Sequence, residues 1–337
     1  MNVKIIKIIR LKCIFFLVLF SCSLLFSNGS FSVETISQED GLRDGPDYSE
    51  ALVYYPLEAS NYLPVVILVP GFTNSLSDIE NWGYYLASYG FVTLLVNVNS
   101  IFQPPDYRSA ALLDGIVTMR EENGRLDSPL FGNLNIEDFA VGGYSMGGGG
   151  AQLAAQQDSS IKAVIALSPW LENPDVTLNN STSILFISGE FDNVASNDYH
   201  TNVFYDNTSD TTDKMLYEIS GGDHYTVASP YSDQEMGLKI VFWLEKYILS
   251  NLSNCDSLII QPATASDFST NIECPSIFIG DITEDGNVNI LDLLLLVSWV
   301  INGNVLSESE VSLADITNDG VLGIFDIIML IDIIQSR

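Results

Sequence analysis

The stretch that decides the fold is Gly143-Tyr144-Ser145-Met146-Gly147, which runs directly into three more glycines. The apolar residues 139–143 lead into it as a predicted strand, and residues 151–157 follow it with helical spacing. A Gly-x-Ser-x-Gly string between a strand and a helix is the signature of a nucleophile elbow, a tight turn that lifts the serine hydroxyl clear of the sheet. The sequence therefore predicts Ser145 as a nucleophile and the Met146 N–H as one donor to an oxyanion.

On both sides of this motif, apolar runs alternate with stretches of helical spacing. The runs lie at residues 63–69, 91–96, 163–167, 184–187 and 215–219, and residues 236–249 read as a closing amphipathic helix. This alternation is typical of a mostly parallel sheet with helices on both faces. Together with the elbow, it predicts the α/β-hydrolase fold, an α/β class.

A serine hydroxyl needs a general base, and the chain has only two histidines. His224 follows a predicted strand and precedes the last helix, whereas His200 lies in a polar stretch. We therefore predict that His224 is the base for Ser145.

The acid that orients the histidine is expected between the serine and the histidine in chain order. Asp192 follows the predicted strand 184–187 and meets this condition. It would hold the imidazole of His224 in the correct tautomer and stabilise the imidazolium. Glu190 and Asp223 are the alternatives for this role.

Two further loops are expected to line the site. The run Val69-Pro70-Gly71-Phe72 follows an early strand, which makes the Phe72 N–H the second expected oxyanion donor. Trp170 follows another strand, and ligands of such sheets bind at the carboxyl ends of the strands. We therefore expect Phe72 and Trp170 on opposite sides of a substrate cleft, with packing in the core as the other reading of Trp170.

Residues 48–274 resemble the bacterial cutinase and polyethylene terephthalate (PET) hydrolase family. Besides the elbow, the matching segments are VYYP at 53–56, VPGFT at 69–73, LASYGFV at 86–92, NVNS at 97–100, SPW at 168–170, DNVA at 192–195 and GGDH at 221–224. The resemblance implies a serine ester hydrolase with the triad and oxyanion donors named above. It also implies a cleft for aromatic esters, lined by Phe72, Tyr144, Trp170 and Val194.

Three features distinguish the chain within this resemblance. The residue before the nucleophile is Tyr144, where the family usually has His or Trp. The second disulfide of some members has no cysteines to form it here. His200 and Tyr225 resemble the cutinase members, in which an imidazole and an aromatic ring flank the tryptophan.

The C-terminal part contains an internal duplication. The segment DITEDGNVNILD at 281–292 recurs 34 residues later as DITNDGVLGIFD at 315–326, and each copy runs into an apolar helix. The tail resembles a dockerin, a pair of calcium-binding loop–helix repeats. In such a loop, positions 1, 3, 5, 7, 9 and 12 supply oxygens and glycine at position 6 permits the turn. The expected ligands are Asp281, Thr283, Asp285, the Asn287 carbonyl, Asn289 and Asp292 in loop one, and Asp315, Thr317, Asp319, the Val321 carbonyl and Asp326 in loop two.

The two loops are not equivalent, because Gly323 has no side chain at position 9 and loop two is expected to bind calcium more weakly. The positions at which dockerins read their cohesin partner are apolar here, Ile290-Leu291 and Ile324-Phe325. The resemblance implies a cohesin-like or cell-surface partner for residues 281–337. We expect no cofactor for catalysis.

The N-terminus reads as a targeting segment. A basic stretch precedes an apolar run at residues 13–26, which is the pattern of a signal peptide, with cleavage near Gly29. The alternative is a lipoprotein anchored at Cys22. Export leaves Cys255 and Cys274, which as a lone pair in an oxidising compartment predict one disulfide.

The chain is strongly acidic, with a formal net charge of -30 in 337 residues. Residues 1–29 contribute four basic residues and no acid, so cleavage would leave -34. Such a surface repels nucleic acid and anionic headgroups, because phosphate binding requires clustered Lys or Arg. We therefore expect no nucleic-acid binding. Beyond the N-terminal segment no apolar stretch has the length of a membrane helix, so we also expect no membrane span.

The sequence as a whole predicts a secreted two-domain enzyme. Its parts are a signal peptide at 1–29, a flexible lead-in at 30–47, a hydrolase domain at 48–274, a linker at 275–280 and the repeats at 281–337. The leading function is cleavage of polyester bonds in cutin-like, aliphatic or PET polymers. The alternatives are a general carboxylesterase or lipase and, more remotely, a calcium-dependent adhesion or scaffold protein with an inert hydrolase domain.

Overall fold

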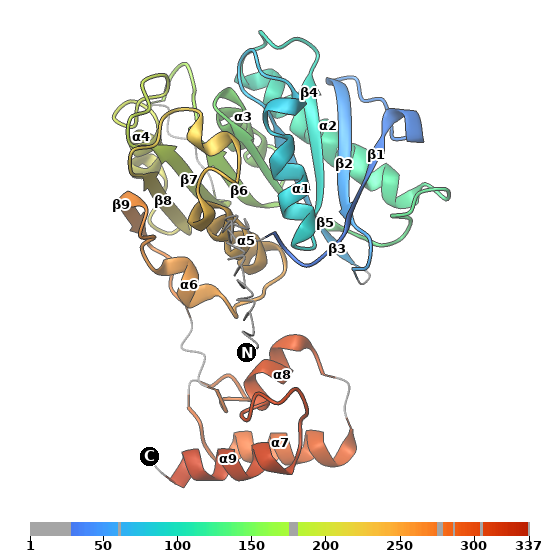
Figure 1. Ribbon diagram of the computed structural model, residues 1–337, viewed down its shortest axis with the longest axis vertical. Coiled ribbons are helices and arrows are strands. Elements are labelled where there is room, and N and C mark those ends of the chain that lie inside the picture. The colour runs from blue at the N-terminus through green and yellow to red at the C-terminus, as the bar shows by residue number, and fades with distance from the viewer. Residues whose placement is uncertain are drawn as a thin grey trace, which may run out of the picture.

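The computed structural model describes residues 28–59, 62–174, 181–274, 279–285, 287–303 and 306–335. Within these ranges one nine-stranded sheet has the order β1-β2-β4-β3-β5-β6-β7-β8-β9 (Figure 1). The strands are β1 (Val33–Ser37), β2 (Tyr48–Pro56), β3 (Leu63–Val69), β4 (Val92–Val98), β5 (Leu134–Tyr144), β6 (Ile161–Leu167), β7 (Ser183–Gly189), β8 (Lys214–Ile219) and β9 (Ala265–Thr270). Strands β3 to β8 are parallel, and β1, β2 and β9 pair antiparallel at the two edges.

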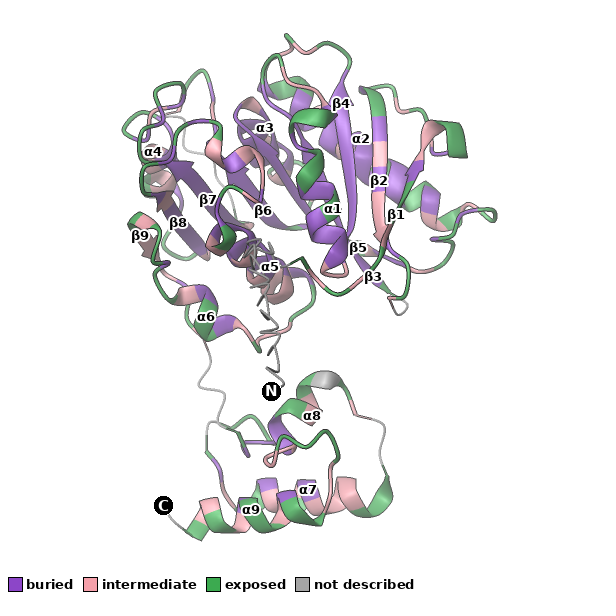
Figure 2. Ribbon diagram, in the orientation of Figure 1, coloured by how far each residue is buried: buried purple, intermediate pink, exposed green. Residues whose placement is uncertain are grey.

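Helices cover both faces of the sheet, and two apolar cores result. The helices of this part are α1 (Glu80–Ser88), α2 (Pro105–Gly124), α3 (Met146–Ala155), α4 (Thr201–Asn207), α5 (Gln234–Ile248) and α6 (Cys255–Ile259). Buried residues of α2, α3 and α4 join one core, and those of α1, α5 and α6 join the other. Strands β3 and β4 are buried along their whole length (Figure 2), as expected for central strands covered on both faces. The predicted α/β-hydrolase fold is confirmed.

Two edge strands lie where the sequence predicts irregular chain. Residues 30–47, expected to be a flexible lead-in, contain β1, which pairs with β2 through five residue pairs. Ile36 and Leu42 in this segment are 3% exposed, so the lead-in packs on the core. Likewise, β9 lies in the Ser- and Thr-rich stretch after α6 and pairs with β8. Edge strands with few apolar residues carry little periodic signal, and the sheet supplies their hydrogen bonds.

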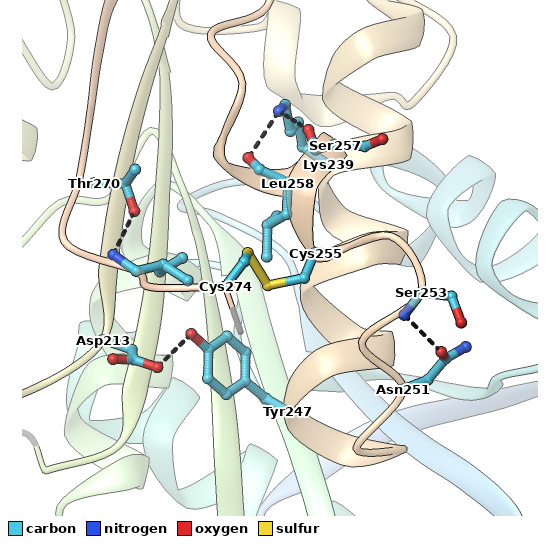
Figure 3. Close-up of a disulfide and its surroundings, with 11 residues drawn as sticks. Asp213, Lys239, Tyr247, Asn251, Ser253, Cys255, Ser257, Leu258, Thr270 and Cys274 are labelled. Carbon is cyan, nitrogen blue, oxygen red and sulfur yellow. Dashed lines mark hydrogen bonds between the residues drawn. A yellow bond between two sulfur atoms is a disulfide. The ribbon is translucent and has the colours of Figure 1, made fainter. Parts of the chain in front are cut away.

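The predicted disulfide is confirmed. The sulfur atoms of Cys255 and Cys274 are bonded and tie the start of α6 to the segment after β9 (Figure 3). Beside it, the ammonium of Lys239 on α5 donates to the carbonyl oxygens of Ser257, Leu258 and Ile260 at 2.5–2.8 Å. These contacts attach α6 and the antiparallel edge to α5.

The C-terminal repeats form helices α7 (Ile290–Asn302), α8 (Glu308–Ala314) and α9 (Ile324–Gln335), which lie apart from the sheet in Figure 1. Ile282, Val288, Leu296, Ala314 and Leu330 make a small core of their own. Of the helices in the described part of the chain, none combines the length and apolar character needed to cross a membrane. Cys22 and residues 1–27 of the signal peptide predicted at 1–29 lie outside the described residues.

Candidate active site

Ser145 occupies a strained turn between β5 and α3. Its backbone has φ 57° and ψ -118°, a conformation that costs a non-glycine residue of the order of 1–3 kcal/mol. The neighbouring glycines are sterically required. A Cβ on Gly143 would lie 2.5 Å from the Gly147 carbonyl carbon, and one on Gly147 would lie 2.3 Å from the Val69 oxygen. The turn can therefore close only with glycine on both sides of the serine, as an elbow requires.

Three side chains from loops at the carboxyl ends of parallel strands meet here. Ser145 follows β5, Asp192 follows β7 and His224 follows β8. The Ser145 Oγ lies 3.0 Å from His224 Nε2, and His224 Nδ1 lies 2.7 Å from Asp192 Oδ2. All three residues are at most 7% exposed. The serine thus has a base within hydrogen-bond reach, and the base has a carboxylate behind it.

The Asp192 carboxylate is held in its charged form. Its burial alone would raise the pKa, but hydrogen bonds from His224 and from the N–H groups of Ala195 and Val194 outweigh burial and lower it. The two amides donate to Asp192 Oδ1 at 2.8 and 2.9 Å, which leaves Oδ2 for the imidazole. A charged acceptor in this position favours the tautomer that carries its proton on Nδ1.

The other candidate residues lie elsewhere. The Glu190 carboxylate accepts hydrogen bonds from the Gly221 N–H and the Ser220 hydroxyl, so it ties the Asp192 loop to the His224 loop. Asp223 accepts from the N–H groups of the two residues after His224. His200 packs with its ring centroid 5.9 Å from that of Trp170. None of these three side chains replaces Asp192 or His224 in the hydrogen-bonded chain.

The loop after β3 lies directly against the nucleophile. A Cβ on Gly71 would lie 2.9 Å from Ser145 Cβ, so only glycine allows this approach. Within the described residues, no group accepts a hydrogen bond from the Phe72 N–H, which follows Gly71 in the loop. The Met146 N–H lies in the first turn of α3, where helical amides have no partner within the helix. The two expected oxyanion donors are thus available beside Ser145.

Exposed aromatic and apolar side chains surround this group. Phe72 is 43% exposed and contacts Phe102, which is 65% exposed, with ring centroids 5.9 Å apart in an edge-to-face arrangement. Trp170 is half-buried beside His200, and Val194 is 51% exposed. The rim therefore offers apolar contact to a substrate larger than a single acyl group. Phe102 lies in no recognisable sequence motif, so the sequence alone gives no signal for it.

Tyr144 differs from the expectation that it lines the cleft. Its side chain is 2% exposed, and its ring lies 5.1 Å from the His224 imidazole, so it supports the base from within the core. Burial raises the pKa of the Tyr144 hydroxyl. Among the described residues this hydroxyl has no hydrogen-bond partner.

The two C-terminal loops repeat one set of contacts around buried carboxylates. Asp292 and Asp326 are 0% exposed. Asp292 accepts hydrogen bonds from the N–H and hydroxyl of Thr283 and from the Asn289 N–H, and Asp326 accepts from the same groups of Thr317 and from the Gly323 N–H. In the described ranges, no three His, Cys, Asp or Glu side chains form a metal-binding group on their own. The oxygen-rich loops fit a hard cation only through their mixed carboxylate, hydroxyl, amide and carbonyl donors.

A serine, a histidine and a buried carboxylate in one hydrogen-bonded chain at the carboxyl edge of an α/β sheet define the class of serine hydrolases with the α/β-hydrolase fold. A family model described as PET hydrolase-like matches residues 21–274. The chain belongs to this PET hydrolase-like family and is a carboxylic ester hydrolase. A model of the dockerin type I domain matches residues 279–335, so the enzyme carries a dockerin at its C-terminus.

Curated proteins are similar to the chain over about two thirds of its length. Cutinase est2 of Thermobifida alba is 32% identical over 225 residues, which are 66% of this chain and 71% of that protein. Cutinase est1 of the same organism is 32% identical over 228 residues, 66% of this chain and 72% of that protein. Lipase 1 of Moraxella sp. is 29% identical over 226 residues, 66% of each.

Proposed function

We propose that the enzyme hydrolyses polyesters, with Ser145 as nucleophile, His224 as general base and Asp192 as the acid that orients it. The observation that carries the proposal is the hydrogen-bonded chain from Ser145 Oγ to Asp192, which opens beside the exposed ring of Phe72. The Phe72 and Met146 N–H groups are the proposed oxyanion donors. Two cutinases among the similar proteins support a polymeric ester as substrate.

The reaction follows from these positions in two halves. As Ser145 Oγ bonds to the ester carbonyl carbon, its proton passes to His224 Nε2 and the carbonyl electron pair moves to the oxygen held by the two amides. The oxyanion then collapses, the bond to the alkoxy oxygen breaks, and His224 returns the proton to the leaving alcohol. A water molecule attacks the acyl-enzyme in the same manner, which releases the acid and restores Ser145.

The rim residues select what is presented to Ser145. Phe72 and Trp170 offer aromatic surfaces, and Val194 contributes an aliphatic one. Rings of a semi-aromatic ester or methylene groups of an aliphatic one can stack there, because both gain from burial of apolar area. The rim reaches the solvent, so a chain end or loop of an insoluble polymer has access.

The test is acid release from amorphous PET film and from polycaprolactone emulsion, beside hydrolysis of a soluble short-chain aryl ester, by residues 30–337. Release from both polymers by the wild type and its loss in Ser145→Ala is the expected result. Turnover of the soluble ester alone would overturn the polymer substrate and leave a general carboxylesterase or lipase. Failure on all three substrates would point to an inert hydrolase domain in an adhesion or scaffold protein.

We also propose that the dockerin loops bind calcium. Asp281, Thr283, Asp285, Asn287, Asn289 and Asp292 would hold it in loop one, and Asp315, Thr317, Asp319, Val321 and Asp326 in loop two. The support is the dockerin match and the oxygen-bearing side chains that both loops carry at the same positions, with the carboxylates of Asp292 and Asp326 buried in the loops. The only basic residue after position 278 is Arg337. The calcium is structural in this proposal and takes no part in ester hydrolysis.

The proposed partner of the repeats is a cohesin-like protein with an apolar contact surface. Ile290, Leu291, Ile324 and Phe325 are 54–66% exposed and occupy equivalent positions of the two repeats. Such a role implies an extracellular enzyme, in agreement with the predicted signal peptide. The mass of the mature N-terminus separates cleavage near Gly29 from a lipidated Cys22. Calcium-dependent binding to a panel of cohesin modules, lost when Leu291 and Phe325 are both changed to Ser, tests the partner.

A further inference from the structure

Arg108 is a buried charge that the proposed mechanism does not use. It lies in the first turn of α2 and is 0% exposed. Within the described residues no carboxylate lies within ion-pair distance of its guanidinium, although the chain as a whole is rich in acids. Burial of a charge without a counterion is costly unless hydrogen bonds satisfy it. The partners of Arg108 therefore indicate why an arginine stands here.

Its partners are backbone carbonyls of two loops. Nε donates to the Pro70 oxygen at 2.9 Å and Nη2 donates to the Gly71 oxygen at 2.6 Å. Nη1 donates to the Gln103 oxygen, and Nη2 also reaches the Ile101 oxygen at 3.3 Å. The first loop carries Phe72 and the second carries Phe102. One planar fork thus holds the two loops that border the nucleophile from this side.

We propose that Arg108 is a positioning residue that orients the Gly71–Phe72 peptide as an oxyanion donor. The inference rests on the proposed function, in which the Phe72 N–H is one of the two donors. A peptide group is planar and trans, so its C=O and N–H point in opposite directions. A guanidinium that fixes the Gly71 oxygen on the side of α2 therefore turns the Phe72 N–H away from α2.

On its other side, the backbone of this loop lies against the nucleophile turn. The hypothetical Cβ of Gly71 falls 2.9 Å from Ser145 Cβ and 3.1 Å from the Tyr144 oxygen, so the backbone here touches the nucleophile turn. With the Gly71 oxygen held by Arg108, the Phe72 N–H has no acceptor among the described residues. Arg108 thus fixes the oxygen of the Gly71–Phe72 peptide group, and the N–H of the same group remains available to donate a hydrogen bond.

The charge on Arg108 adds to the effect of geometry. A cationic donor on a peptide oxygen polarises the amide and strengthens the N–H at its other end, since linked hydrogen bonds reinforce each other. Burial lowers the pKa of Arg108 to about 10, which still leaves the guanidinium protonated at neutral pH. Lysine would not replace this fork, because an ammonium is a point charge and cannot meet four carbonyls in one plane.

The hydrogen bonds of Arg108 to these four carbonyls, here called the clamp, also hold the Phe102 loop beside the Phe72 loop. The Thr73 N–H donates to the Ile101 oxygen at 2.9 Å, beside the contact of Arg108 with that oxygen. The rings of Phe72 and Phe102 meet edge to face. Loss of these hydrogen bonds should therefore loosen the contact between the Phe72 and Phe102 rings and also the position of the Phe72 N–H. Of the two effects, only the second changes the stabilisation of the transition state.

The test compares an aryl butyrate with its thiono analogue, in which sulfur replaces the carbonyl oxygen. Sulfur is a weaker hydrogen-bond acceptor and sits on a longer bond, so an oxyanion hole favours the oxygen ester. In Arg108→Lys we expect kcat for the oxygen ester to fall on the order of 10- to 100-fold per titrated active site, with KM little changed. The thiono ester should be affected much less, so the oxygen-to-sulfur rate ratio should shrink by a similar factor.

The control is Arg120→Lys, a partly exposed arginine of the same helix whose contacts lie at the Ile136 carbonyl and the Ser160 hydroxyl. It should leave both rates and their ratio unchanged. A merely structural Arg108 would lower the rates for both esters equally, and an unchanged ratio would overturn the inference. A wild type that does not discriminate between the esters would instead contradict the proposed oxyanion hole.

A second variant covers the case in which Arg108→Lys does not fold. A Cβ on Gly150 would lie 2.7 Å from Arg108 Cβ and 3.0 Å from the Pro105 oxygen, so Gly150→Ala should push the first turn of α2, and Arg108 with it, away from α3 while the charge is kept. We expect the rate ratio to shrink here too. Gly124→Ala is its control, because a Cβ at this end of α2 meets nothing within 4 Å. A normal ratio in folded Gly150→Ala would count against the clamp.

Discussion

The hydrolase part and the dockerin repeats bury charges in opposite ways. In the hydrolase part, the Asp192 carboxylate has His224 and two amides, and the Arg108 guanidinium has four carbonyls, so the fold itself satisfies both groups. In the repeats, Asp292 and Asp326 are equally buried but receive only N–H and hydroxyl groups. The hydrolase site is complete as folded, whereas the proposed function assigns a calcium ion to each loop of the repeats.

This difference predicts which perturbations act on each part. Substitutions at the triad should lower ester hydrolysis and leave the stability of the repeats unchanged. Removal of calcium should destabilise the repeats and leave ester hydrolysis unchanged. The separate core of the repeats supports such independence. The five predictions that follow test the contrast, beginning with the largest expected effect.

Replacement of Asp192 by Asn should have the largest effect. The amide keeps the shape of the carboxylate but holds the wrong tautomer of His224, so kcat should fall roughly 10³- to 10⁴-fold. Steady-state kinetics on a soluble ester measures the loss, and calcium binding by the repeats should not change. Glu190→Gln is the matched control, since Glu190 contacts Ser220 and Gly221, and its effect should stay within about tenfold. A larger loss of kcat in Glu190→Gln would indicate that Glu190, and not Asp192, orients His224.

The same carboxylate should give the enzyme a sensitivity to acid. The folded-state pKa of Asp192 is lowered, because the hydrogen bonds from His224 and the two amides outweigh burial. Its stabilisation is therefore complete above the unfolded pKa of about 4 and is lost as the pH falls through the lower folded value. Asp192→Asn should show a smaller loss of stability in that range.

Much of this site could be predicted from sequence because its requirements are local. The glycines around Ser145 follow from a turn without room for side chains, and Asp192 and His224 follow strands in the order that the fold needs. Arg108 and Phe102 carry no such signal. Their importance depends on which loops the sheet brings together, and a sequence motif does not report the carbonyls that a buried guanidinium meets. Strands β1 and β9 were missed for a related reason, since their partners β2 and β8 define them.

Calcium removal should have the next largest effect, confined to the repeats. A ligand at 100 to 1,000 times its dissociation constant stabilises the folded form by about 2.7 to 4.1 kcal/mol. Chelation by EDTA should therefore lower the melting temperature of the repeats in residues 30–337, as calorimetry would resolve, with kcat on the soluble ester unchanged. Asp292→Asn should weaken the tighter of two binding events and Asp326→Asn the weaker one, because Gly323 offers no side-chain oxygen. Repeats equally stable without calcium would contradict the contrast.

Loss of the disulfide should have a somewhat smaller effect, confined to the hydrolase part. Cys255 and Cys274 are 19 residues apart, and closing a loop of this size contributes about 3 kcal/mol in the chain-entropy model. The double variant Cys255→Ser, Cys274→Ser should unfold at a lower temperature. Its kcat at 25 °C should be unchanged, since the bond lies at α6 and not at Ser145. A loss of kcat without a loss of stability would show that this edge is coupled to the triad.

The smallest effect should come from Tyr144→Phe, which removes a neutral polar group that the hydrolase part leaves unsatisfied beside the triad. The Tyr144 hydroxyl is one of several buried side-chain atoms without a hydrogen-bond partner among the described residues. Its removal should raise the free energy of unfolding by about 1 kcal/mol, as expected for the loss of an unsatisfied polar atom. The ring against His224 remains, so kcat should stay within about twofold. Denaturant unfolding and ester kinetics measure both quantities, and a large fall in kcat would mean that this hydroxyl serves the imidazole or the substrate directly.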